Sequence, residues 1–359
     1  MKKKIKVIQI IDQPSGGGAE KICRNISRLL IEREINTNII YFKNPKNINL
    51  EKFEKVYSGK LGYFGFIFFI RKIIKEETNK KYTKVIVQSH LTKSLYFTPL
   101  TTLKFKCKKI FVEHNTNYRR RRFVFLKYIE RYIYTKYDKI ICVSNATLSS
   151  LKNWLKKDNI IERMLVVYNG LNLQLIKKEK SRYSDKYRFV SIGSLTHQKG
   201  FDISIQALAR LKFKNWHYKI LGEGPEKSKL KELVNKLNLS DKITFTGYQD
   251  KIDNYMIESD IMIIPSRWEG FGLVAIEGLS YGMPIVVSDV PGINEIVQNS
   301  EVCILYKPED LSHLALSIEN SIKLLLDTDL NIEKEALKQA TKFDEKTMIN
   351  NYINIYNDL

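Results

Sequence analysis

The stretch PSRWEGFGLVAIEGLSYGMPIVVSDVPGINE, residues 265–295, decides the fold of this 359-residue chain. It follows the apolar run 261–264, which has the length of a buried strand. A glycine-containing loop (267–272), a helix-like segment (273–281) and a second β-rich run (284–288) come next. Strand, loop, helix and strand form the βαβ unit of a parallel sheet, and ligands bind such α/β sheets beyond the carboxyl ends of the strands. The loop therefore lies where a ligand binds.

Two carboxylates occupy this unit, Glu269 in the loop and Glu277 in the helix. Gly270 and Gly272 let the backbone approach a ligand closely, and the unpaired N–H groups at the start of a helix attract an anion. A carboxylate only accepts hydrogen bonds, so two of them on either side of backbone donors suit a ligand with hydroxyls at both ends and phosphate between. A nucleotide sugar has this layout. Two solvated glutamates on a helix surface are the alternative.

The stretch resembles the EX7E motif of the family 4 glycosyltransferases, which are retaining enzymes of GT-B fold; the segments PS, EGFGLV and YGMPIV also match. The resemblance implies two doubly wound, Rossmann-like α/β domains that face each other across a cleft. It also implies that Glu269 accepts from hydroxyls of the donor sugar, that Glu277 holds the ribose, and that the N–H groups around Phe271 and Gly272 meet the diphosphate. One departure is Gly278, because alanine often follows the second glutamate in the family.

The length of the chain predicts two domains, since a domain usually has about 100 to 200 residues. We expect a first domain at 1–172, which binds the acceptor, and a polar linker at 173–186. A nucleotide-sugar domain at 187–342 follows, and a terminal helix at 343–359 is expected to pack back on the first domain. The four scattered cysteines lack the spacing of metal ligands and fit a cytosolic protein.

The net charge of +21 is unevenly distributed. Residues 1–180 hold 39 Lys and Arg against 14 Asp and Glu, a net charge of +25, whereas the remainder carries −4. Such a basic surface suits nucleic acid or anionic lipid, and charge alone does not choose between them. No recognition helix or RNA-binding motif appears, so we expect no nucleic-acid partner.

A glycine loop follows the first predicted strand, 5–11, and precedes a segment of helical periodicity. It contains Gly16, Gly17 and Gly18 and can bring a phosphate or sugar close to the backbone, although a simple tight turn is the alternative. GGGAE resembles the family's loop, which lies near the donor phosphate and the acceptor.

Two histidines follow predicted strands of the first domain. His90 either faces the cleft or is an ordinary loop residue. His114, in the segment EHN, can donate to a sugar hydroxyl or stabilise developing positive charge through its partners. In the family a histidine at this strand end contacts the donor sugar, which makes His114 a candidate catalytic residue together with Glu269 and Lys199.

A run that mixes arginines with aromatic residues extends to Tyr134 and resembles a basic interfacial helix. Several family members sit on the inner leaflet through this region, which suggests peripheral membrane or acceptor binding; a solvated turn is the alternative. The candidate residues are Arg119, Arg120, Arg121, Arg122 and Phe123.

The second domain opens with a strand that ends at Gly193, and Lys199 follows at the position of the family's diphosphate-binding lysine. The arginine usual after this glycine is Ser194 here, so Arg267 is expected to help neutralise the diphosphate. Tyr248, at the exit of a later strand, is a candidate to stack on the base.

Together these features predict a retaining glycosyltransferase that moves a hexose or N-acetylhexosamine from a nucleotide diphosphosugar, with UDP favoured, to a saccharide acceptor. The basic first domain suggests a lipid-linked acceptor in bacterial glycan assembly, such as O-antigen or capsule, at the inner face of the cytoplasmic membrane. No DxD metal motif is evident, and the resemblance implies no cofactor. The alternatives are a nucleotide-sugar hydrolase or epimerase of the same fold, and a non-catalytic nucleic-acid-binding protein.

Overall fold

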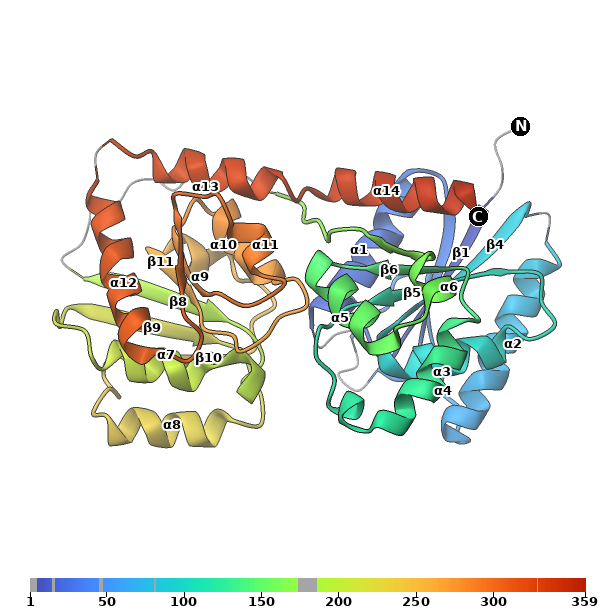
Figure 1. Cartoon of the computed structure of the whole chain (residues 1–359), viewed down its shortest axis with the longest axis horizontal. Helices are drawn as coiled ribbons and strands as arrows, with labels where there is room; N and C mark the ends of the chain where they lie inside the picture. The colour runs from blue at the N-terminus through green and yellow to red at the C-terminus, as the bar shows by residue number, and fades with distance from the viewer. Residues whose placement is uncertain (1–4, 15–16, 45–47, 81, 174–185, 328) are drawn as a thin grey trace. The chain divides into compact units, whose positions relative to one another are not determined.

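The computed structural model describes residues 5–14, 17–44, 48–80, 82–173, 186–327 and 329–359 (Figure 1). The chain divides into two compact units. The first comprises residues 1–170 and 346–359, and the second comprises residues 171–345. The predicted linker falls mostly on residues 174–185, which lie outside the described residues.

The first unit contains a parallel sheet with the strand order β3-β2-β1-β4-β5-β6-β7. Its central strand β1 is buried along its whole length, as its apolar sequence IKVIQII predicts for a sheet covered on both faces. The strands are β1 (Ile5–Ile11), β2 (Asn36–Tyr41), β3 (Glu54–Val56), β4 (Lys84–His90), β5 (Lys108–Glu113), β6 (Lys139–Cys142) and β7 (Met164–Val166).

Helices cover both faces of this sheet. Successive side chains of a strand point to opposite faces, and the apolar side chains on each face pack against a helix. Ile8 and Ile10 pack against α2, whereas Ile11 packs with Cys23 of α1. The helices of this unit are α1 (Gly18–Glu32), α2 (Gly62–Thr78), α3 (Leu91–Thr101), η1 (Arg119–Arg122), α4 (Val124–Tyr134), α5 (Asn145–Leu155), α6 (Asp158–Ile161) and α14 (Glu345–Asp358).

The last helix, α14, is held to the first unit by polar contacts as well as by its buried apolar face. Lys84 Nζ donates to the carbonyls of Tyr356 (2.8 Å) and Asn357 (2.9 Å), which are carbonyls that a helix end leaves without intrahelical partners. Tyr356 Oη donates to Gln88 Oε1 at 2.7 Å. The chain therefore leaves the first unit once and returns to it for its final helix.

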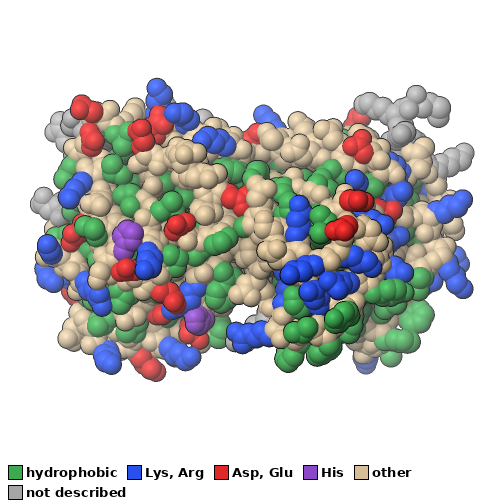
Figure 2. Space-filling model, in the orientation of Figure 1, with side chains coloured by type: hydrophobic (Ala, Val, Ile, Leu, Met, Phe, Trp, Pro, Cys, Tyr) green, Lys and Arg blue, Asp and Glu red, His purple; other side chains and the backbone are tan. Residues whose placement is uncertain are grey.

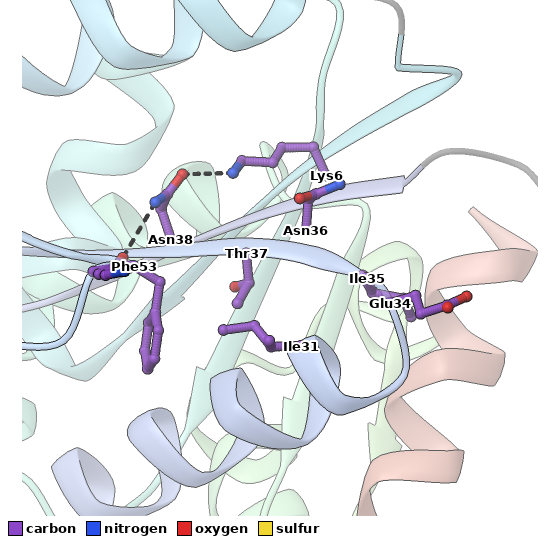
Figure 3. Close-up of a pocket in the computed structure, with 9 residues that line it drawn as sticks. Lys6, Ile31, Glu34, Ile35, Asn36, Thr37, Asn38 and Phe53 are labelled. Atoms are coloured by element: carbon purple, nitrogen blue, oxygen red, sulfur yellow. Dashed lines mark hydrogen bonds between the residues drawn. The ribbon is translucent and has the colours of Figure 1, made fainter.

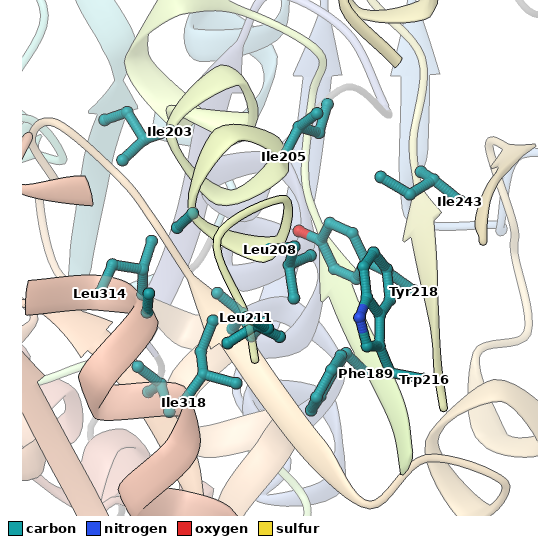
Figure 4. Close-up of a cluster of buried hydrophobic side chains, with 14 of the residues drawn as sticks. Phe189, Ile203, Ile205, Leu208, Leu211, Trp216, Tyr218, Ile243, Leu314 and Ile318 are labelled. Carbon is teal, nitrogen blue, oxygen red and sulfur yellow. The ribbon is translucent and has the colours of Figure 1, made fainter. Parts of the chain in front are cut away.

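The second unit contains a parallel sheet with the order β10-β9-β8-β11-β12-β13. Figure 4 shows one side of its core, where Phe189, Trp216 and Tyr218 pack with Leu208 and Ile318 from the covering helices. The strands are β8 (Tyr187–Ile192), β9 (Trp216–Leu221), β10 (Ile243–Gly247), β11 (Ile261–Ile264), β12 (Ile285–Ser288) and β13 (Cys303–Tyr306). The helices are η2 (His197–Lys199), α7 (Phe201–Leu208), α8 (Lys227–Lys236), α9 (Asp253–Ile257), α10 (Leu273–Ser280), α11 (Asn294–Val297), α12 (Leu311–Leu326) and α13 (Ile332–Thr341).

The predicted α/β class with two doubly wound, Rossmann-like domains is confirmed by these two sheets. In the described residues, no helix combines the length and apolar content that crossing a bilayer requires.

Candidate active site

Each sheet has a topological switch point between two neighbouring strands. From one of these strands the chain continues toward one edge of the sheet, and from the other it continues toward the opposite edge. In the second unit β8 and β11 are neighbours at this point, and in the first unit β1 and β4 are. Open α/β sheets bind ligands at the carboxyl ends of such strands. The loops that follow these strands carry most of the residues singled out from the sequence.

In the second unit the loops after β8 and β11 are joined through their backbones. The Arg267 N–H donates to the Gln198 carbonyl at 2.8 Å, and Gln198 Nε2 donates to the Trp268 carbonyl at 3.0 Å. Gly200 has φ +63°, and a Cβ atom there would lie 2.0 Å from the Pro265 carbonyl oxygen. Only glycine allows this close approach, so residues 193–200 and 265–272 pack directly against each other and form one platform.

Lys199 and Glu269 meet on this platform. Lys199 Nζ donates to Glu269 Oε1 at 2.6 Å, and the Ser266 hydroxyl donates to the same oxygen at 2.7 Å. Glu269 is 6% exposed, and the stem of Lys199 lies over Gly193, where an added Cβ would be 3.4 Å from it. The pair places one ammonium and one carboxylate side by side at the switch point, which suits a ligand carrying both phosphate and hydroxyl groups.

Arg267 has a different set of partners from the one the sequence suggests. Its guanidinium makes a bidentate pair with Asp202 (2.9 and 2.7 Å) and donates to Glu309 at 2.7 Å and to the His197 carbonyl at 2.9 Å. Burial raises the pKa of Asp202, but the Arg267 hydrogen bonds outweigh it and lower that pKa overall. These contacts favour a positioning role for Arg267 in holding the loop after β8, and its predicted contact with diphosphate stays a prediction.

The start of α10 follows directly from this platform. Gly272 has φ +95°, and a Cβ there would lie 2.8 Å from Ile293, so the backbone turns sharply before the helix begins. Gly270 and Phe271 in the same turn are buried, and Glu277 is half-buried on the helix. A helix start leaves N–H groups without intrahelical partners that can meet an anion, and in α10 the third N–H, that of Ala275, already donates to the Gly272 carbonyl at 2.9 Å.

Gly278 stands where the family often has alanine, and an added Cβ at this position would lie 2.7 Å from Met262 Sδ.

Two further candidates, Ser194 and Tyr248, are exposed. The Tyr248 side chain is 52% exposed, and its phenol faces Asp250. Both remain predicted donor contacts.

The glycine loop of the first unit leads from β1 into α1. Gly16 lies outside the described residues, whereas Gly17 is the residue before α1 and Gly18 begins it, both exposed. Glu20 in the first turn is buried, which raises the pKa of its carboxyl. The backbone is accessible at these exposed glycines, and the contact of this loop with the donor stays a prediction.

The structure brings His90 and His114 together at the carboxyl ends of β4 and β5. His90 Nδ1 and His114 Nε2 are 2.9 Å apart, and His90 Nε2 lies 2.8 Å from Gln9 Oε1. Burial lowers the pKa of His114 to about 4, and burial together with the neighbouring His114 lowers the pKa of His90 well below 6.5. Both rings are therefore neutral at pH 7. Sequence reasoning missed Gln9, although a glutamine among the apolar residues of a central strand is a signal.

Glu113, next to His114, anchors the loop that follows β5. It is fully buried; its Oε2 accepts from Tyr134 Oη at 2.8 Å and from Arg121 Nη2 at 3.0 Å, and Tyr118 Oη donates to its Oε1. In the same way Arg120 Nε donates to the buried Glu130 at 2.5 Å. Arg120 and Arg121, which the sequence suggests as candidates for membrane or acceptor binding, therefore point inward and support the loop, whereas Arg122 is exposed.

A hollow of about 450 Å³ lies at the other end of the first sheet, beside the amino ends of β1 and β2 (Figure 3). Lys6, Asn36, Thr37 and Asn38 line it, and Lys6 Nζ donates to Asn38 Oδ1 at 2.5 Å. None of the candidate residues lies there.

Two family models match adjoining parts of the sequence. The "Glycosyltransferase Family 4" model matches residues 16–175, and the "Glycosyl transferases group 1" model matches residues 174–342. The chain belongs to the family 4 glycosyltransferases. This confirms both the predicted family and the prediction of a transferase.

Relatives of this glycosyltransferase agree with the family. An uncharacterised glycosyltransferase of Haemophilus influenzae is 28% identical over 324 residues, which cover 86% of this chain and 88% of the relative. The O-antigen biosynthesis glycosyltransferase WclY of Escherichia coli is 29% identical over 202 residues, 54% of this chain and 55% of WclY. Anabaena HepE, solved in complex with UDP and glucose, superposes with a TM-score of 0.83 at 19% identity, covering 98% of this chain and 99% of HepE. The superposition supports the GT-B fold.

Proposed function

We propose that this glycosyltransferase transfers a hexose or N-acetylhexosamine from a UDP-sugar to a saccharide acceptor with retention of the anomeric configuration. The observation that carries the proposal is the Lys199–Glu269 pair, which two interlocked loops hold at the switch point of the second sheet. The UDP and glucose bound by HepE and the O-antigen role of WclY support the donor class and the glycan acceptor.

In this proposal each group of the second unit has a separate role. Glu269 accepts hydrogen bonds from the donor sugar, and Glu277 accepts from the ribose. As the bond between sugar and phosphate breaks, negative charge grows on the diphosphate; Lys199 and the first N–H groups of α10 stabilise it. Lys199 and these N–H groups stabilise part of the leaving group's negative charge, and that the reaction needs no metal ion stays a prediction.

Nucleotide binding tests the donor class. We expect UDP, but not GDP or ADP, to stabilise the protein by about 2.7 kcal/mol at 100 times its dissociation constant. Glu277→Ala should abolish this stabilisation because the ribose loses its acceptor. A thermal-shift titration measures both, with Glu232→Ala, on the exposed face of α8, as the matched control. If GDP or ADP stabilises instead, the donor assignment is wrong; if Glu277→Ala still responds to UDP, the ribose assignment is wrong.

A hydrolase or epimerase of this fold would act on the donor without an acceptor. Incubation of the protein with UDP-sugars alone, followed by chromatography of the products, separates these activities from transfer. Free sugar or an epimerised donor at the rate of the acceptor-dependent reaction would favour the alternative.

We also propose that the first unit binds the membrane surface and that the acceptor is lipid-linked. An unusual set of large apolar side chains is exposed on α4 and just before it, with exposed fractions from 45% to 66%. This α4 apolar face consists of Phe123, Val124, Phe125, Tyr128, Ile129 and Tyr132. Further exposed apolar side chains lie in and around α2 and α3, at Leu61, Phe64, Phe68, Leu100 and Leu103. Figure 2 shows hydrophobic side chains gathered where Figure 1 labels these helices.

The spacing of these residues suits a helix that lies in the membrane interface. Val124, Tyr128 and Tyr132 recur every four residues and so share one side of α4. Cationic Arg122 and Lys136 flank this side, and both are exposed. Because Arg120 and Arg121 are paired with buried carboxylates, the proposed contact with lipid rests on the aromatic side chains and on the flanking cations rather than on the arginine run.

Vesicle binding tests this surface. We expect the protein to co-sediment with phosphatidylglycerol vesicles at low salt, and the double variant Phe125→Ser, Tyr128→Ser to bind about tenfold more weakly, since each aromatic ring contributes to burial in the interface. The matched control is Leu316→Ser, Leu326→Ser, which removes two side chains of similar exposure from α12 of the second unit. Equal losses in both variants, or no binding by the wild type, would contradict the proposal.

A further inference from the structure

A chain of buried polar side chains connects α1 to His114 through β1 and β4. Gln9 and Gln88 lie in register on neighbouring strands, and His90 is two residues beyond Gln88, on the same face of the sheet. Gln9, Gln88 and His90 are completely buried. We infer that Gln9 and His90 are positioning residues which hold His114 as the tautomer protonated on Nε2, so that its Nδ1 accepts a hydrogen bond from the substrate.

The orientation of the Gln9 amide is the first step. Gln9 Nε2 lies 3.1 Å from the Cys23 carbonyl oxygen, and a carbonyl oxygen can only accept. The amide nitrogen must therefore face α1, where it also donates to Ser27 Oγ. The amide oxygen then faces β4, where Gln88 Nε2 lies 3.2 Å from it.

The protonation of His90 follows from this orientation. His90 Nε2 lies 2.8 Å from Gln9 Oε1, an acceptor, and 3.2 Å from Gln88 Nε2, an amide donor. The shorter contact assigns a proton to His90 Nε2, and the Gln88 amide then donates to Gln9 Oε1 at 3.2 Å. A neutral imidazole carries only one proton, which leaves His90 Nδ1 as an acceptor. The opposite tautomer would bring two lone pairs together at 2.8 Å between completely buried side chains, a costly arrangement for polar atoms.

His114 is the last member of the chain. His90 Nδ1, an acceptor, is 2.9 Å from His114 Nε2, so His114 donates through Nε2 and its Nδ1 carries a lone pair. Among the residues that the structure describes, His114 Nδ1 has no hydrogen-bond partner, and the ring is half-buried. His114 thus accepts from a hydroxyl group, in contrast to the donor role expected from the sequence. That the hydroxyl belongs to a sugar rests on the proposed function.

Nitrogen NMR of the full-length protein labelled with ¹⁵N-histidine tests the tautomer without an activity assay. We expect long-range ¹H–¹⁵N correlations at pH 7 to show His90 and His114 neutral and protonated on Nε2. The spectrum of His114→Gln, which lacks one set of peaks, assigns His114 among the five histidines. A protonated Nδ1 in His114 of the wild type would overturn the inference, and so would a wild-type spectrum in which fewer than two histidines are neutral and protonated on Nε2.

Two matched variants then test the cause. Gln9→Met keeps the shape of the side chain but removes the acceptor for His90, so His114 should become a mixture of tautomers. Gln88→Met removes an equally buried amide that competes as a donor at His90 Nε2 but leaves the Gln9 acceptor in place, so His114 should stay protonated on Nε2. Identical spectra for the two variants would overturn the roles of Gln9 and His90.

We also expect Gln9→Met to lower kcat/KM about fivefold to tenfold, which corresponds to the free energy of one hydrogen bond. A transferase assay that fails in the wild type while the spectrum is as expected would count against the proposed function alone.

Discussion

Glu269→Gln should lower kcat about 10²- to 10³-fold, the loss seen when one group that stabilises a transition state is removed. Glutamine has nearly the same shape as glutamate, but it lacks the negative charge that Lys199 faces at 2.6 Å. Its amide nitrogen also cannot accept from a sugar hydroxyl. Because the side chain is buried between two interlocked loops, water cannot replace the lost acceptor. Steady-state kinetics with a UDP-sugar and a saccharide acceptor measure the effect.

The matched control for this variant is Glu258→Gln. Glu258 pairs with Lys219 at 2.7 Å in the same unit, but its side chain is 54% exposed and lies outside the platform. This variant should keep kcat within about twofold, since exposed ion pairs contribute little. A similar loss of activity in both variants would mean that the Lys199–Glu269 pair has no special role in catalysis.

Glu113→Gln should destabilise the first unit by about 3–5 kcal/mol, the cost of removing one partner from a buried ion pair. The Glu113 carboxylate accepts from Arg121 and from two tyrosine hydroxyls, all within the loop and helix that follow β5. Glutamine keeps the volume but leaves the largely buried Arg121 guanidinium without its closest carboxylate. Urea unfolding followed by circular dichroism measures the change in the free energy of unfolding.

Glu51→Gln is the control for this prediction, because Glu51 pairs with Arg28 at 2.5 Å on an exposed part of the same unit. Its free energy of unfolding should change by less than about 1 kcal/mol. If Glu113→Gln is no more destabilising than Glu51→Gln, the buried network does not hold the loop, and the inward orientation of Arg120 and Arg121 loses its explanation.

The βαβ unit around residues 265–295 was predictable because its signals are local. The predicted strand at 261–264 is β11, and the predicted helix at 273–281 differs from α10 by one residue at its end. Apolar runs of strand length between polar loops must be buried on both faces, which requires parallel strands with helices on either side. Gly272 of the predicted loop is explained by its φ of +95° and by the Ile293 side chain, which would lie 2.8 Å from an added Cβ.

The sequence by itself determined the α/β class, the family, and the strand ends on which the candidate residues lie, because periodicity and motif spacing are properties of neighbouring residues. Only the tertiary structure decided what those residues contact. The carboxylate partners of Arg267 are 65 and 42 residues away in the chain, and His90 is 81 residues from Gln9. Pairings over such distances depend on strand order and on the register between strands, and neither can be read from the residues that flank each partner.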